Sequence, residues 1–250
     1  CSSGSEKAAV LPEPEAVWGT EGEREVRLVQ DHAVYAGMVE AMDLAVGRVL
    51  NALKELQIDR NTVVIFMSDN GGLSTSEGHP TSNLPLRAGK GWLYEGGIRT
   101  PMLIRWPGVT DSGKIIDVPA ISTDFYPTML EMAGLAARPQ QHLDGASLVP
   151  LLQGGRAPDR DAMYWHYPHY GNQGGTPGAA IREGDWKLIE YFEDRPPALY
   201  NLAEDPSEQR DRAGEMEEKV VALRAKLDAW QTEIGARFPS SNPGAKPPSQ

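Results

Sequence analysis

Residues 63–72 read Val-Val-Ile-Phe-Met-Ser-Asp-Asn-Gly-Gly, an apolar run that ends in an acid, an amide and two glycines. A continuous run of β-branched and aromatic residues is typical of a buried parallel strand, and open α/β sheets bind ligands just beyond the carboxyl ends of such strands. Asp69 and Asn70 therefore stand where a binding site is expected. Their carboxylate and amide oxygens suit a hard cation such as Ca²⁺ or Mg²⁺, and the glycines let the backbone turn tightly away.

The segments on either side of this run predict an α/β arrangement. Apolar residues recur at helical spacing from about 31 to 57, which predicts a long amphipathic helix whose stripe, Tyr35 to Leu56, packs in the core. A helix that leads into a buried strand is half of a βαβ unit, so an earlier partner strand is expected. A second strand is expected at about 101–106, and a helix at about 123–133.

Composition divides the chain into four parts. Residues 1–30 are polar and contain Pro and Gly, so they predict a linker, and residues 31–157 form the larger α/β part. Between 158 and 238, four short strand-like segments precede an amphipathic helix at about 215–234, which predicts a small α+β subdomain with an antiparallel sheet. Residues 239–250 are expected to be a flexible tail.

Charge and cysteine content limit the classes of partner. The 250 residues carry a formal net charge of -11 and no run of Lys or Arg, which disfavours nucleic acid and anionic membranes as general partners. No stretch approaches the roughly 18 apolar residues of a membrane span. Cys1 is the only cysteine, so there is no intrachain disulfide. Cys-Ser-Ser-Gly-Ser also resembles the start of a mature bacterial lipoprotein, and the alternative interpretation of Cys1 is an arbitrary start point.

A long loop between Asp69 and Ile98 carries further candidate residues. Loops of this length inside compact domains are often functional. Lys90 stands between two glycines, which would let its backbone come close to a bound group while its ammonium neutralises an oxyanion. An isolated Gly-Lys-Gly favours a solvated loop, but one that follows a strand-terminal Asp-Asn favours a functional lysine. His79 is a candidate substrate contact, and Arg87 is expected to contact either the bound anion or the loop itself.

His166 and His169 lie in a dense aromatic segment. Their spacing could indicate a metal site, but Pro168 disfavours a helix and no acidic third ligand stands nearby. We expect both histidines to line a substrate cleft, because aromatic faces suit sugar rings, with plain packing as the alternative.

Four other polar residues are interpreted as structural. Glu95 and Arg99 are expected to brace the loop through an ion pair with each other. Asp124 is expected at the surface or as a helix cap. His32 stands at the start of the predicted long helix and is expected to be structural.

Three motifs stand in order along the chain: residues 68–71 (Ser-Asp-Asn-Gly), 86–91 (Leu-Arg-Ala-Gly-Lys-Gly) and 94–101 (Tyr-Glu-Gly-Gly-Ile-Arg-Thr-Pro). Together they resemble the carboxyl-terminal half of the formylglycine-dependent type I sulfatases, the arylsulfatase group. The resemblance covers about 35–235, because further segments agree in the same order. These segments are residues 36–50, 122–130 and 199–208.

The resemblance implies a fold, a function and residue roles. The fold is an alkaline-phosphatase-like α/β sandwich, of which this chain is similar to the second half, with the small antiparallel sheet and helix packed beside it. Asp69 and Asn70 are implied to complete the coordination of a divalent cation, usually Ca²⁺ and otherwise Mg²⁺. Lys90 is implied to be a catalytic residue that binds the sulfate group. The implied reaction is hydrolysis of a sulfate ester, with a sulfated carbohydrate as the expected substrate and a periplasmic or extracellular location.

One part of the family pattern is absent from these 250 residues. The family nucleophile is a formylglycine made within a Cys-x-Pro/Ala-x-Arg motif, and the residues after Cys1 include neither the Pro/Ala nor the Arg. The upstream Asp-Asp metal pair also has no match. We therefore expect a fragment that is inactive alone and whose partner is the N-terminal half of the sulfatase domain. The alternatives are a non-catalytic remnant or binding module, and a phosphodiester or phosphonate hydrolase of the same fold.

Overall fold

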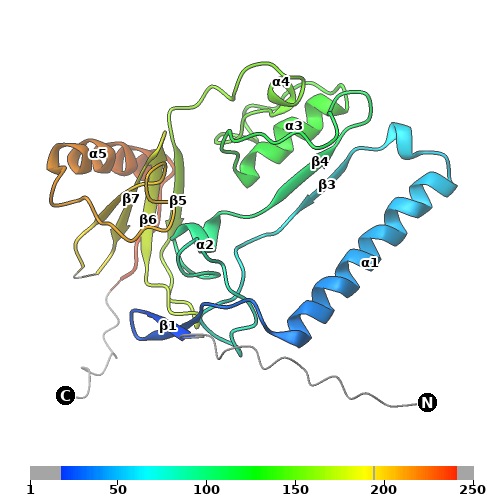
Figure 1. The fold of residues 1–250 in the computed structure, drawn as a ribbon. Coiled ribbons are helices and arrows are strands. Elements are labelled where there is room, and N and C mark those ends of the chain that lie inside the picture. Colours follow the sequence, from blue (N-terminus) through cyan, green and yellow to red (C-terminus); the bar gives the residue numbers. More distant parts are fainter. Residues whose placement is uncertain (1–17, 194, 241–250) are drawn as a thin grey trace, which may run out of the picture.

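The computed structural model describes residues 18–193 and 195–240 (Figure 1). Cys1, with its lipoprotein-like context, and residues 241–250 of the predicted tail lie outside these ranges. Within the described chain, no helix is both long enough and apolar enough to cross a membrane.

The described chain begins with a β-hairpin. β1 (Trp18–Glu21) pairs antiparallel with β2 (Arg24–Arg27) around Gly22, which has a φ of +57°. The prediction of a linker over residues 1–30 is therefore wrong for residues 18–27. Four-residue strands rich in Glu and Arg show no apolar alternation, so the sequence pattern gave no strand signal there.

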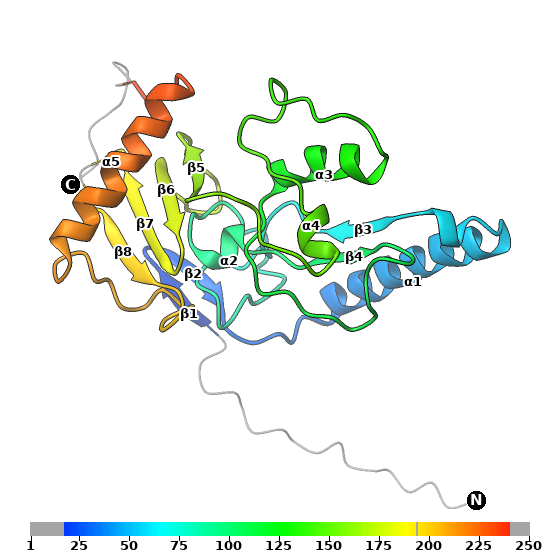
Figure 2. The ribbon, with the colours of Figure 1, turned by 90° about the horizontal axis from the view of Figure 1, so that it is seen from above.

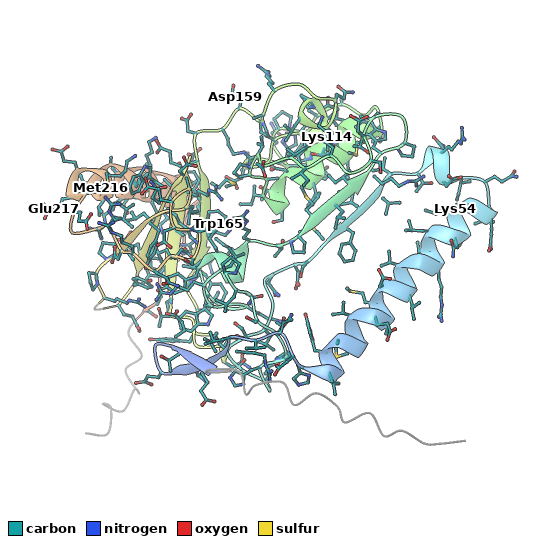
Figure 3. The ribbon with its side chains drawn as sticks, viewed as in Figure 1. Lys54, Lys114, Asp159, Trp165, Met216 and Glu217 are labelled. Atoms are coloured by element: carbon teal, nitrogen blue, oxygen red, sulfur yellow. The ribbon has the colours of Figure 1, made fainter. Side chains whose placement is uncertain are left out.

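α1 (Ala33–Glu55) confirms the predicted long helix. His32 caps its start, because the ring Nδ1 accepts a hydrogen bond from the Tyr35 amide at 3.2 Å, and its expected structural role is confirmed. The helix buries none of its residues, and Met38 is 63% exposed. The expectation that the Tyr35 to Leu56 stripe packs in the core is therefore wrong within the described chain. Figure 3 shows the side chains along this helix, with Lys54 marking its last turn.

β3 (Val64–Met67) follows the short 3₁₀ helix η1 (Asp59–Asn61) and pairs with β4 (Met102–Arg105). The pairing is antiparallel, with Val64 opposite Arg105, and no residue of either strand is buried. The expected buried parallel strand is therefore wrong within this chain. A continuous apolar run indicates that both faces of a strand are to be covered, but it does not specify the direction of the neighbouring strand.

The 3₁₀ helix η2 (Ser122–Asp124) continues into α3 (Phe125–Met132), close to the predicted helix. Asp124 is wholly buried, so a surface position is excluded. Its carboxylate accepts hydrogen bonds from the Ile121 amide at 2.9 Å, the Ala146 amide at 3.0 Å and Arg160 Nη2 at 2.6 Å. Asp124 therefore caps this helical segment and joins it to Ala146 and Arg160, which lie on either side of α4 (Val149–Leu152).

The C-terminal sheet has four antiparallel strands in the order β5-β6-β7-β8. The sequence pattern predicted these strands and the helix that follows them, α5 (Glu217–Glu233). The strands are β5 (Met163–Tyr167), β6 (Gly178–Glu183), β7 (Trp186–Tyr191) and β8 (Ala198–Asn201).

Each face of this sheet is covered by a different part of the chain (Figure 2). On one face, Leu188 packs with Leu223 and Leu227 of α5. On the other face, Ile189 packs with Trp92 and Tyr94, which belong to the loop before α2 (Glu95–Ile98). The loop with the candidate site residues therefore shares a core with the C-terminal sheet. The domain division at residue 157 stays a prediction.

Replacing Asp124 by Ala should destabilise the fold by about 3 kcal/mol, because it leaves Arg160 and two backbone amides without their buried acceptor. Asp111→Ala is the matched control, since Asp111 is exposed. Urea denaturation followed by circular dichroism measures both. Equal stability of the two variants would contradict the assigned role.

Candidate functional site

Asp69 and Asn70 follow β3 after a single residue, Ser68, at the position that the sequence predicts. Asp69 is exposed and Asn70 is half-buried. Ser68 Oγ donates to the Asn70 carbonyl at 2.7 Å, and Asn70 Nδ2 donates to the Gly71 carbonyl at 3.1 Å. The amide nitrogen is thus used within the turn, and the amide oxygen is the atom that remains as a ligand.

The turn after Asn70 packs directly on the backbone of α2. Gly71 N donates to the Gly97 carbonyl at 2.9 Å. A Cβ atom at Gly71 would lie only 1.7 Å from the Gly96 carbonyl oxygen, so no larger residue fits here. The short helix α2 therefore sets the place of the turn.

Asn83 joins this turn to the loop that carries Lys90. Its Oδ1 accepts from the Gly72 amide at 3.1 Å, while Nδ2 donates to the Gly72 carbonyl at 2.7 Å and to the Ala88 carbonyl at 2.8 Å. The sequence did not predict this role for Asn83, because a single amide inside a long loop carries no signal of its partners.

Lys90 lies beside the same turn. Its side chain is exposed, and its amide donates to the Gly72 carbonyl at 3.1 Å. The Gln173 carbonyl accepts hydrogen bonds from Trp92 Nε1 at 3.0 Å and from Thr75 Oγ1 at 2.8 Å, which holds the other side of the loop. The structure therefore brings the Lys90 backbone next to the turn that presents Asp69 and Asn70.

His79 is half-buried and has a φ of +47°. Its carbonyl accepts a hydrogen bond from Arg27 Nε at 2.5 Å, so the hairpin fixes its backbone. A substrate contact through its ring stays a prediction.

Arg87 is half-buried, and its guanidinium is paired with other residues of the chain. Its guanidinium donates to both carboxylate oxygens of Glu21 at 2.6 and 2.7 Å, to Tyr200 Oη at 3.1 Å and to the Glu208 carbonyl at 2.8 Å. It also lies 3.9 Å from the centre of the Tyr94 ring. Burial is the largest single influence and would lower the pKa of Arg87, but the hydrogen bond to Glu21 and the electrostatic attraction of Tyr94, Glu21 and Tyr200 together outweigh it and leave the pKa above its ordinary value. This geometry supports the structural alternative rather than a contact with a bound anion.

His166 packs on the α5 side of the sheet. Its Nδ1 lies 3.0 Å from Gln231 Nε2, its Nε2 lies 2.9 Å from the Arg237 carbonyl, and its ring contacts Phe192 and Phe238. The Lys90 loop covers the opposite face, so these contacts favour the packing alternative for His166, and its expected place in a substrate cleft stays a prediction. His169 is exposed and contacts the Tyr167 ring, and its expected contact with substrate stays a prediction.

A buried ionic cluster links α2 to the sheet. Lys187 Nζ, on β7, lies 3.0 Å from Glu95 Oε1 and 2.9 Å from Glu208 Oε1. Glu208 Oε2 also accepts from the Glu95 amide at 2.6 Å. Burial raises the pKa of Glu208, and Lys187 opposes that shift. The expected Glu95–Arg99 pair is wrong, because the Glu95 side chain faces the sheet and pairs there with Lys187. The long spacing between Glu95 and Lys187 left no sequence signal of their contact.

Asp69 and Asn70 supply part of what a divalent cation requires. Asp69 and Asn70 offer two hard oxygen ligands, which fit Ca²⁺ or Mg²⁺ in kind but do not complete a coordination sphere of six or more. Over residues 18–193 and 195–240, no group of three or more His, Cys, Asp or Glu side chains could hold a metal ion.

Asn83→Ala should destabilise the chain by about 2 kcal/mol and speed amide hydrogen exchange at Lys90, because the Gly72 and Ala88 backbone groups lose their partner. Asn172→Ala is the control, since it removes a single exposed hydrogen bond to Glu77. Thermal denaturation and exchange measured by NMR test this role, which would be refuted by unchanged exchange at Lys90.

Two family models match the chain. One, described as N-sulphoglucosamine sulphohydrolase, C-terminal, matches residues 88–233, and one described as Sulfatase matches residues 4–135. A protein of Formosa agariphila named Sulfatase is 37% identical over 221 residues, which cover 79% of this chain and 39% of that protein. Human arylsulfatase D is 32% identical over 234 residues, covering 81% of this chain and 39% of that protein. The chain thus spans well under half the length of these relatives.

Solved structures agree with these matches. Ps i-CgsB in complex with k-i-k-neocarrahexaose has a TM-score of 0.72 and 33% identity, covering 85% of this chain and 46% of that one. BT4656 in complex with D-glucosamine-2-N, 6-O-disulfate has a TM-score of 0.67 and 29% identity, covering 80% and 40%. The phosphonate monoester hydrolase of Agrobacterium radiobacter has a TM-score of 0.61 and 27% identity, covering 80% and 41%. The expected alkaline-phosphatase-like fold is confirmed, and the chain belongs to the sulfatase family, matching its C-terminal half.

Proposed function

We propose that this chain carries part of the active site of a sulfatase that hydrolyses a sulfate ester on a carbohydrate. The hydrogen bond from Lys90 N to Gly72 O carries the proposal, because it joins the lysine loop to the turn that presents Asp69 and Asn70. The family membership supports the reaction. The saccharides bound by Ps i-CgsB and BT4656 support the class of substrate.

Asp69, Asn70 and Lys90 divide two roles between them, binding of the cation and binding of the sulfate. Asp69 and Asn70 hold a hard divalent cation, Ca²⁺ or Mg²⁺, through the carboxylate and the amide oxygen. Such a cation, when bound, supplies Lewis-acid polarisation of the sulfate oxygens. Lys90 binds the sulfate as a point charge and stabilises negative charge that develops on its oxygens. Asn83 and α2 keep the turn and the lysine loop in one arrangement before substrate arrives.

The nucleophile and the remaining metal ligands come, in this proposal, from the other half of the sulfatase domain. We assign no nucleophile to this chain, because its residues do not fit the formylglycine motif. The apolar surface of α1 supports a covering partner, since Val34 is 70% exposed and Val49 is 60% exposed. Leu103 of β4 is also 60% exposed. Large apolar surfaces of this kind mark interaction sites.

Phosphonate ester hydrolysis is the second candidate reaction. It is favoured by the likeness to the Agrobacterium radiobacter enzyme. A hard cation and a lysine stabilise phosphonate oxygens by the same electrostatics, so the chemistry of these residues serves both substrates.

Asp69→Ala should weaken Ca²⁺ binding at least tenfold, because it removes the charged ligand, whereas Lys90→Ala should leave Ca²⁺ binding within about twofold and abolish binding of inorganic sulfate. Isothermal titration of the complex between this chain and the N-terminal half of a close family member measures both effects, because the chain alone supplies only two of the cation's ligands. Asp111→Ala, an exposed acid elsewhere, is the control. Unchanged Ca²⁺ affinity in Asp69→Ala would refute the assignment of the metal ligand.

The chain alone should not hydrolyse an aryl sulfate, and activity should appear when it is co-expressed with the N-terminal half of a close family member. In that complex Lys90→Ala should lower kcat/KM at least 100-fold, about 2.7 kcal/mol of transition-state stabilisation. An aryl phosphonate assayed in parallel separates the two candidate reactions. Turnover of aryl sulfate by the chain alone would show that it needs no partner.

A further inference from the structure

We propose that Lys187, on the C-terminal sheet, is a positioning residue for the site formed by Asp69, Asn70 and Lys90, and that it acts through α2. This inference rests on the proposed function for its catalytic meaning. The contacts within the chain by themselves support its structural part, which is that Lys187 fixes the turn and the lysine loop relative to each other.

Lys187 fixes the first residue of α2 at two points. Its side chain is wholly buried, and its Nζ lies between the carboxylates of Glu95 and Glu208 at 3.0 and 2.9 Å. Glu208 in turn accepts from the backbone amide of Glu95 at 2.6 Å. Both the side chain and the main chain of Glu95 are therefore tied to the same cluster.

α2 contacts both halves of the site. The Gly97 carbonyl accepts from Gly71 N at 2.9 Å, and Gly96 N donates to the Arg87 carbonyl at 2.9 Å. At Gly71 the two backbones are so close that a Cβ would meet the Gly96 oxygen at 1.7 Å. A displacement of α2 is therefore passed to the turn that bears Asp69 and Asn70, and to the segment that leads to Lys90.

Stability alone is a weak reason for a charge at position 187. The direct cross-strand neighbours of Lys187 are Arg182, whose Nη1 lies 3.8 Å from Glu95 Oε2, and Tyr200, while Ile189 and Ala198 on the same face are apolar and buried. A buried ion cluster commonly gives no more stability than well-packed apolar residues, because desolvation costs as much as the attraction returns. The cluster adds geometric specificity. A charged hydrogen bond holds the Glu95 side chain in one orientation, whereas an apolar contact would allow several.

The test compares Lys187→Met with Leu227→Ala by amide hydrogen exchange in NMR, without cation or substrate. Leu227 is fully buried on the α5 face of the same sheet, so its truncation supplies a loss of stability without touching α2. Each variant is measured at the same number of degrees below its own Tm. The exchange rates of the Gly71 and Lys90 amides should then be at least tenfold higher in Lys187→Met than in Leu227→Ala. Equal effects of both variants at these two amides would overturn the proposal.

A second variant separates positioning from loss of packing. In Lys187→Met/Glu208→Gln, the new amide can accept from Glu95 N and donate to the Glu95 carboxylate, which restores the anchor of α2 without the cation. Protection of Gly71 and Lys90 should return to within threefold of the parent chain. Failure of that return would show that Lys187 does not act through α2. If Lys187→Met does not fold, Glu95→Ala, which removes the contact between α2 and Lys187 and leaves Lys187 paired with Glu208, takes its place in the comparison with Leu227→Ala and faces the same criterion.

The outcome is independent of catalysis. Hydrogen exchange is measured on the folded chain alone. If the complex with the N-terminal half bound neither Ca²⁺ nor sulfate, the proposed function would be overturned and the positioning result would stand. Conversely, normal binding of both ions together with equal exchange in Lys187→Met and Leu227→Ala would overturn the positioning role alone.

Discussion

The contact between the backbones of Gly71 and α2 is the constraint on which the candidate site depends. No side chain separates the two segments, so the amide of Gly71 reaches the Gly97 carbonyl directly. Asp69 and Asn70 enter this contact from β3, and Lys90 reaches the same turn through the Gly72 carbonyl. The exposed polar groups thus stand on a backbone framework whose geometry is set by main-chain hydrogen bonds rather than by the polar groups themselves.

The C-terminal sheet supports this backbone framework, because the lysine loop packs on one of its faces. Trp92 and Tyr94 anchor the lysine loop in the apolar face of the sheet, and Arg87 ties the loop to Glu21 of the hairpin. Arg87 and the Lys187 cluster both reach Glu208, a wholly buried residue between β8 and α5. A loop rich in glycine has little order of its own, so its precision comes from the elements that it packs against.

Local patterns predicted the elements well and their partners poorly. Spacing of apolar residues located α1, the four C-terminal strands and α5, because amphipathic periodicity is a property of a short segment. Their position after an apolar run located Asp69 and Asn70 as candidates, the flanking glycines singled out Lys90, and the family motifs supplied their implied roles. The structure places the Lys90 backbone next to the turn that bears Asp69 and Asn70. Arg87, His166 and Glu95 looked like site or loop residues in sequence, yet the hydrogen-bond and ion-pair partners of their side chains stand 65 or more positions away along the chain. Glu21 lies in a hairpin with no apolar alternation, so the local sequence pattern did not predict that strand. The exposure of α1 depends on which other segments cover it, and a local pattern does not contain that information.

The two ends of the described chain differ in how their apolar surface is covered. The C-terminal sheet has α5 on one face and the lysine loop on the other, whereas α1 buries none of its residues. Local opening free energies follow such differences in burial, so the chain has a gradient of local stability that rises from α1 toward the sheet. The lysine loop belongs to the cooperative unit of the sheet, and the Asp69–Asn70 turn stands at the boundary of that unit. The side of the site that faces α1 is therefore expected to open locally more often than the anion-binding side.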